Sequence, residues 1–177
     1  IIALSACLAG DISQALMDRN YEKAKNIALQ YRDIFGEGNF YLEIQDHGLP
    51  EQKEVNAALV KLSKEINIPL VATNDIHYVN KEDSKIHDVL MCIQMGKTVN
   101  DPNRMRFGSD EFYLKSREEM EELFPYAPEA IDNTVKIAEM CNIEFDFNTI
   151  HLPKYVVPEG YTPDTYLREL CFKCLEE

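Results

Sequence analysis

Several features are missing from this 177-residue chain, and each absence excludes a class of protein. No apolar run approaches the length that crosses a membrane, and no signal peptide precedes the first predicted strand. The five cysteines are odd in number and scattered along the chain, which argues against a disulfide framework. We therefore expect reduced thiols, a cytoplasmic location and no membrane partner.

Positive charge is also scarce. The chain has 18 Lys and Arg against 31 Asp and Glu, a formal net charge of −13, so most of its surface should repel phosphate. The charge is unevenly spread. Residues 96–117 contain five cations and three acids, whereas residues 118–149 contain nine acids and only Lys136. The bulk of the chain is therefore not expected to cradle DNA.

The loop from Gly96 to Ser109 is the one basic segment. It has two glycines, a proline and no periodicity, which is typical of an ordered loop. Arg104 and Arg106 allow two interpretations: they contact a nucleic-acid backbone, or they anchor this segment on carboxylates elsewhere in a larger protein. The second is favoured, because arginine forks are common in domain interfaces.

What is present is an alternation of short apolar runs and helical stretches. The runs are Ile1–Cys7, Phe40–Gln45 and Pro69–Tyr78, and the stretches between them, Tyr21–Phe35 and Glu51–Ile66, have apolar residues at helical spacing. Parallel strands need crossover helices, so this order predicts an α/β fold with a parallel sheet or a (β/α) barrel.

Metal-capable side chains follow the predicted strands. Asp75 and His77 are two residues apart and would project from one side of a strand, and Cys7 and His47 fall at the same carboxyl edge of the sheet. Such donors suit zinc, or manganese or iron less well. The plain alternative is that Asp75 only caps the next element, and no H-x-H pair completes a set of ligands.

The remaining length has helical and extended patterns. Helices are expected over Lys81–Met95, after the capping-box spacing Ser116-x-x-Glu119, and over Glu129–Met140, with an extended linker across His151–Pro163. His87 and Cys92 are explained as ordinary helix residues, although His87 as an additional metal ligand is the alternative. Cys171 and Cys174 have i, i+3 spacing and, without a second pair, are better explained as core than as zinc ligands.

Five fragments resemble one known family. They are LSACLAGDI, GEGNFYLEIQDHGLPEQ, PLVATNDIHY, HDVLMCIQMGKT and NRMRFGSDEFYLKS, and they are similar, in order, to the alpha subunit of bacterial DNA polymerase III. The resemblance implies the later part of a distorted (β/α) PHP (polymerase and histidinol phosphatase) barrel over residues 1–95. A basic loop and helical extension would occupy residues 96–150, and a linker and the start of the palm residues 151–177.

The resemblance also implies site residues. The family's late PHP metal ligands, a cysteine in a glycine-rich turn and the Asp and His of an N-D-x-H segment, correspond here to Cys7, Asp75 and His77. Ala6 stands where the family often has glycine, a change expected to be harmless. The early PHP ligands and the magnesium-binding polymerase carboxylates would lie outside this sequence, so we expect a fragment without catalytic polymerase residues. His47 either orients a ligand residue or contacts substrate, or is a turn histidine without a function.

The implied functions differ in class. In the first, the segment belongs to a DNA-directed DNA polymerase whose PHP region forms a 3′–5′ exonuclease site with zinc or manganese. In the second, the region is a catalytically silent scaffold or binds a proofreading subunit. A stand-alone PHP phosphoesterase is the third, and the linker after His151 argues against it. The implied partners are DNA, deoxynucleoside triphosphates, the sliding clamp and other replicase subunits.

Overall fold

The computed structural model describes residues 1–176 and divides the chain into two compact units. The first unit runs from Ile1 to Cys141 and the second begins at Asn142. Each unit is described by itself. The boundaries expected after residues 95 and 150 stay predictions.

A three-stranded parallel sheet lies at the centre of the first unit. Its strands are β1 (Ala3–Leu4), β2 (Phe40–Ile44) and β3 (Leu70–Ala72), in the order β1-β2-β3. The middle strand β2 is buried almost throughout, as its run of large apolar residues requires of a parallel strand covered on both faces. The expected α/β class with a parallel sheet is therefore confirmed, and all three strands end at one edge.

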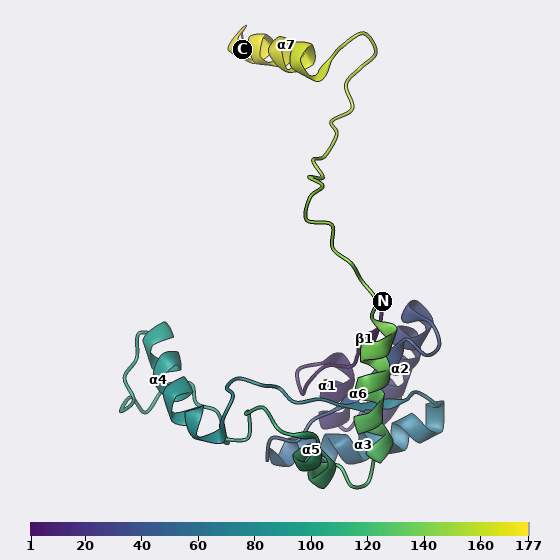
Figure 1. Cartoon of the computed structure of the whole chain (residues 1–177), viewed down its shortest axis with the longest axis vertical. Coiled ribbons are helices and arrows are strands. Elements are labelled where there is room, and N and C mark those ends of the chain that lie inside the picture. The colour runs from purple at the N-terminus through teal and green to yellow at the C-terminus, as the bar shows by residue number, and fades with distance from the viewer. Residues whose placement is uncertain (177) are drawn as a thin grey trace. The chain divides into compact units, whose positions relative to one another are not determined.

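Seven α-helices and one short 3₁₀ helix, η1, are formed by the residues that the structure describes (Figure 1). Their bounds are α1 (Asp11–Met17), α2 (Tyr21–Phe35), α3 (Pro50–Ile66), η1 (Lys81–Asp83), α4 (Ser84–Gln94), α5 (Arg117–Leu123), α6 (Pro128–Met140) and α7 (Pro163–Glu176). The crossovers α2 and α3 begin and end within one residue of their expected bounds, because their apolar residues repeat at helical spacing.

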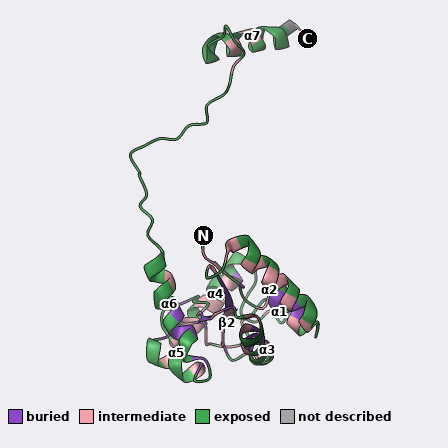
Figure 2. Cartoon of the chain, turned by 90° about the vertical axis from the view of Figure 1, so that its right-hand side faces the viewer, coloured by how far each residue is buried: buried purple, intermediate pink, exposed green. Residues whose placement is uncertain are grey.

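The core forms between the sheet and the helices around it. Leu42 and Ile44 of β2 are fully buried with Leu59 and Leu62 of α3, and Phe124 is as fully enclosed near α5 and α6. Helix α6 packs on β3, where the Asn133 side chain donates a 2.7 Å hydrogen bond to the carbonyl of Leu70. Figure 2 shows this buried band between exposed helix faces. Helix α6 therefore covers the sheet rather than extending away from it.

Two strands are shorter than expected, and one helix was not expected. β1 is two residues long and β3 ends at Ala72, because each pairs only with part of β2. Helix α1 was not expected at all, since its seven residues are too few to display a period. It follows a turn in which Gly10 N donates to Cys7 O at 2.9 Å.

Helix α4 stands apart from the helices that cover the sheet (Figure 1). Its expected apolar stripe is real, but Ile86, Leu90 and Ile93 are exposed rather than packed on the core. The second unit consists of an extended stretch and α7, whose start is capped by the Thr162 hydroxyl accepting from the Thr165 amide at 3.2 Å. No helix within residues 1–176 combines the length and apolarity needed to span a bilayer.

Candidate metal site at the sheet edge

Asp75 and His77 come together just after β3. Asp75 Oδ1 lies 3.2 Å from His77 Nε2, and both side chains are partly open to solvent. A strand does not bring them together, because β3 has already ended. Instead the loop is held by His77 N, which donates to Phe112 O at 2.9 Å, and by a parallel bridge between Tyr78 and Tyr113.

Cys7 lies in the turn after β1 and is exposed. It lines a small cavity of about 10 Å³ together with Glu43, Gln45 and Gln52, room for about one water molecule. Glu43 faces the same region, since its carboxylate accepts hydrogen bonds from the Thr73 hydroxyl and, at 3.2 Å, from Gln45 Nε2. The edge of the sheet therefore carries further polar groups, of which sequence reasoning had left Glu43 undecided between the site and the outside.

The Ala6 backbone corrects one expectation. Its φ is 64°, the left-handed conformation that a Cβ disfavours and that glycine adopts freely. Alanine at this position therefore carries backbone strain that glycine would not, so the change expected to be harmless has a cost in stability.

The donors fit a metal only in part. A carboxylate and an imidazole at 3.2 Å are of a type and spacing that suit two ligands of one divalent ion. Within residues 1–176, however, no three His, Cys, Asp or Glu side chains gather closely enough to hold one. Cys7 therefore does not lie in one cluster with Asp75 and His77.

His47 is almost fully buried, with 1% of its surface exposed. Its Nε2 accepts a 3.1 Å hydrogen bond from the Asp75 amide, and its ring stacks on Phe112 with centroids 4.5 Å apart. Nδ1 lies 2.9 Å from Gln52 Nε2. Burial lowers the pKa of this imidazole, and the nearby Lys115 charge lowers it further. Each ring nitrogen has a nitrogen donor of the protein beside it, and a neutral imidazole can accept from only one of the two. Because the ring is enclosed by these neighbours, the geometry suits a residue that positions Asp75 rather than a metal ligand.

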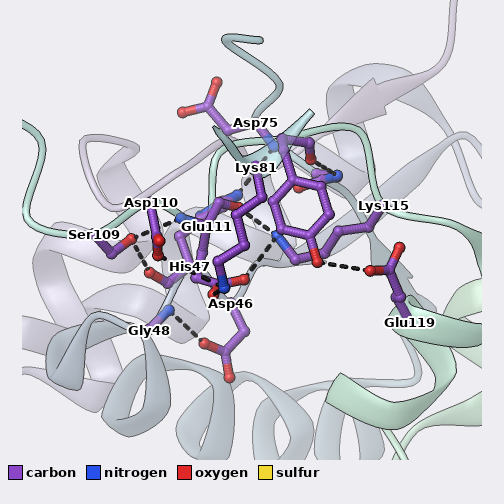
Figure 3. Close-up of polar contacts among 12 residues, drawn as sticks. Asp46, His47, Gly48, Asp75, Lys81, Ser109, Asp110, Glu111, Lys115 and Glu119 are labelled. Atoms are coloured by element: carbon purple, nitrogen blue, oxygen red, sulfur yellow. Dashed lines mark hydrogen bonds and ion pairs between the residues drawn. The ribbon is translucent and has the colours of Figure 1, made fainter. Parts of the chain in front are cut away.

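A charged network borders His47 (Figure 3). The Lys115 side chain is only 2% exposed; its Nζ donates to Glu111 O, lies 3.4 Å from Glu111 Oε2 and sits 4.1 Å from the centre of the Tyr113 ring. Lys81 pairs with the same carboxylate. Sequence reasoning assigned none of these residues to a site. Glu111, Tyr113 and Lys115 lie in the fragment NRMRFGSDEFYLKS, whereas Lys81 lies outside it.

The two arginines of the basic loop behave differently. The Arg104 side chain is 4% exposed and forms a bidentate ion pair with Asp88 of α4 through both terminal nitrogens. Its Nη2 lies 2.6 Å from Asp88 Oδ2. Its carboxylate partner thus lies within this chain. Arg106 is exposed, and its Nη2 donates to Val99 O at 3.3 Å. The two positions, which the sequence presented as one pair, have separate surroundings.

Comparison with known proteins identifies the family to which the chain is similar. The PHP domain family matches residues 1–47, which include β1, β2 and Cys7. Curated relatives match nearly the whole chain: DNA polymerase III subunit alpha of Treponema pallidum is 44% identical over 176 residues, and that of Pseudomonas aeruginosa 43% identical over 177. The Thermus aquaticus protein of the same name is 44% identical over 178 residues, 97% of this chain. The chain is homologous to a segment of the DNA polymerase III alpha subunit.

That homology confirms the family resemblance seen in the fragments. It covers 99% of the chain in the Treponema comparison but only 15% of the longer alpha subunit. The chain therefore spans about one seventh of the length of the DNA polymerase III alpha subunits that it matches. Asp75, His77 and the Lys115 network lie beyond the residues that the PHP family matches.

Proposed function

We propose that this chain is a segment of a bacterial replicative DNA-directed DNA polymerase and that its PHP part contributes to a metal-dependent 3′–5′ exonuclease site. The observation that carries the proposal is the identity of about 44% with DNA polymerase III alpha subunits over nearly the whole chain. Magnesium-dependent polymerisation would depend on carboxylates outside this segment. The proposed partners are DNA, deoxynucleoside triphosphates, the sliding clamp and a proofreading subunit.

The proposed ligands are Asp75 and His77. Cys7, the third ligand that the family resemblance implies, does not lie in one cluster with them within the described residues, so its part in the site is the weaker half of the proposal. A bound zinc or manganese ion would lower the pKa of a water and neutralise the leaving oxygen in phosphodiester hydrolysis. The chain's own part is to hold the Asp75 carboxylate beside the imidazole, and the His47 hydrogen bond to the Asp75 amide supports that placement. Burial lowers the pKa of His47, which favours the uncharged imidazole, the form that has a bare ring nitrogen to accept this bond.

A scaffold role is the second candidate, and a specific observation favours it. Residues 109–115 are tied to the sheet edge by several contacts between residues that are not proposed metal ligands. They include the Ser109 hydroxyl donating to His47 O at 2.5 Å and Lys115 enclosed beside Glu111. A region built this way can support a polymerase whether or not it cuts DNA. The two candidates differ in whether Asp75 and His77 matter for excision.

The test replaces the ligands one at a time in the full-length polymerase. Asp75→Ala and His77→Ala should each lower mismatch excision by at least about 100-fold and reduce bound metal, while primer extension stays within about twofold. Cys7→Ser should do less damage. Excision, extension and metal content by elemental analysis would be measured for each variant.

Matched controls are Asp18→Ala and His151→Ala, which remove the same side chains elsewhere in the chain. Unchanged excision and metal content in Asp75→Ala and His77→Ala would defeat the nuclease proposal. If the parent polymerase excises nothing while the variants lose thermal stability, the scaffold role is selected instead.

A further inference from the structure

A second cavity lies beside α4, away from the small cavity at Cys7. It encloses about 260 Å³ between α4 and the loop of residues 104–110, and its lining includes Tyr78, Lys85, His87, Arg106 and Phe107. This volume is at the small end of ligand pockets, which suits a compact group rather than a large organic molecule.

The charges around this cavity leave an excess of positive charge. Each of its two carboxylates has a cation beside it: Arg104 binds Asp88, and Lys81, whose closer partner is Glu111, lies with its Nζ 3.7 Å from Asp110 Oδ1. Across the described residues, neither Lys85 nor Arg106 has an ion pair with a carboxylate. In a chain with a net charge of −13, two unpaired cations on one cavity form a local site for an anion.

Tyr78 provides an independent observation. It is 9% exposed, and its hydroxyl is the one buried side-chain polar atom of the described residues that has no hydrogen-bond partner. A buried hydroxyl without a partner costs free energy, and such groups are rare in folded proteins. A ligand oxygen in the cavity would supply the acceptor that this phenol lacks.

Aromatic rings line another part of the cavity wall. Tyr78 and His87 lie with ring centres 5.5 Å apart, and Phe107 meets His87 edge to face at 5.1 Å. The His87 ring also lies edge to face against the His77 ring, with ring centres 5.4 Å apart, so this wall reaches the candidate metal pair. Rings beside cations are the combination that holds a nucleotide, whose phosphate is charged and whose base has flat apolar faces.

We propose that this cavity binds a phosphate group, carried by a mononucleotide or by a single nucleic-acid strand, through Arg106, Lys85 and the Tyr78 hydroxyl. Arg104 has a different role: its ion pair with Asp88 shapes the cavity and compensates a negative charge that would compete with the phosphate. The inference does not depend on the exonuclease proposal, because none of the three phosphate contacts is a proposed metal ligand.

The test is a calorimetric titration of the full chain, in the presence of chelator, with inorganic phosphate, deoxyadenosine monophosphate and a short single-stranded DNA. Saturable binding of phosphate and of the mononucleotide is expected. Arg106→Gln and Lys85→Gln should each weaken binding about three- to tenfold, because each removes one charge-assisted contact. Lys64→Gln in α3 removes the same charge elsewhere and should change nothing.

Tyr78→Phe separates a ligand contact from a structural one. It should weaken phosphate binding severalfold while leaving the melting temperature unchanged or slightly higher, since it removes only an unpartnered hydroxyl. If the DNA binds more tightly than the mononucleotide, and Arg106→Gln weakens both equally, a nucleic-acid strand is the source of the phosphate. If the mononucleotide binds more tightly than the DNA, the source is a free nucleotide. No saturable phosphate binding, or equal losses in Lys64→Gln and Arg106→Gln, would overturn the proposal.

Discussion

Lys115 is the side chain whose surroundings constrain the site most strongly. A lysine ammonium that is 98% enclosed must find compensation within the protein, because desolvation of a charge is costly. Glu111 supplies it twice, through its carbonyl and its carboxylate, and the Tyr113 ring supplies a cation–π contact at 4.1 Å. Since the same segment carries Phe112, which stacks on His47, the charge pair and the histidine are held as one unit.

Glu111→Gln should therefore lower the free energy of unfolding by about 1–3 kcal/mol at pH 7, between the values typical of exposed and buried ion pairs. The Lys81 hydrogen bond holds the pKa of the Glu111 carboxyl below its usual value of 4.5. A depressed carboxyl pKa contributes stability that is present above pH 4.5 and lost as pH falls through the folded pKa. The difference in free energy of unfolding between the parent and Glu111→Gln should thus become smaller below about pH 4.5.

Urea denaturation from pH 7 to pH 3 measures that difference, with Glu37→Gln as the control, an exposed carboxylate outside the network. A difference of constant size across this range would mean that the Glu111 charge is not the source of the stabilisation.

Ala6 offers a simple test of backbone strain. Ala6→Gly should raise the free energy of unfolding by up to about 1 kcal/mol, because relief of the left-handed conformation exceeds the entropy that glycine adds to the unfolded chain. Ala3→Gly in β1 is the control, and it should destabilise since strand positions disfavour glycine. Chemical denaturation measures the free energy of unfolding of both variants, and a loss of stability in Ala6→Gly would contradict the strain argument.

The sequence anticipated the candidate site in part at this scale. It placed Asp75 and His77 together, but for the wrong reason, since their pairing depends on a loop held by Phe112 more than thirty residues later. The burial of His47 and the choice of Asp88 as the partner of Arg104 depend on contacts between distant segments. No local pattern contains that information.

At the scale of elements, helices were more predictable than strands. Helices α2, α3 and α6 carry apolar residues at helical spacing, which depends only on the residues of each helix. A strand's length depends on its partner as well, and β3 stops after Ala72 because β2 pairs with it only through Ile44. Helix α1 has seven residues and no side-chain cap, so neither period nor capping signal announced it.

The capping box of α5 was predicted and is present. The Ser116 hydroxyl accepts from the Glu119 amide at 3.3 Å, and the Glu119 carboxylate accepts from the Ser116 amide at 2.7 Å. Ser116→Ala should lower the free energy of unfolding by about 1 kcal/mol. Ser116→Thr should keep most of the parent's stability, because a threonine hydroxyl also caps a helix. Thermal melts of both variants are the measurement. Equal losses in the two would show that the hydroxyl bond is not what matters.

At the scale of the whole molecule, the chain has a folded α/β unit and a second unit that begins with an extended stretch. The unit ending at Cys141 contains the sheet, both cavities and the whole candidate site. Residues 150–157 form no backbone hydrogen bond within the part of the chain that the structure describes, and nearly all of them are exposed. The stability of the site should therefore not require the second unit.

Limited proteolysis tests this division. Lys154 is the only Lys or Arg between residues 142 and 162, and a protease needs an exposed strand of backbone free of hydrogen bonds. Trypsin should cut first after Lys154, ahead of sites in the basic loop, which Arg104 fastens to Asp88. The large fragment should keep the parent melting temperature, and Lys154→Gln should remove the first cut. Early cleavage within α3, or a lower melting temperature of the fragment, would show that the first unit depends on the residues after Cys141.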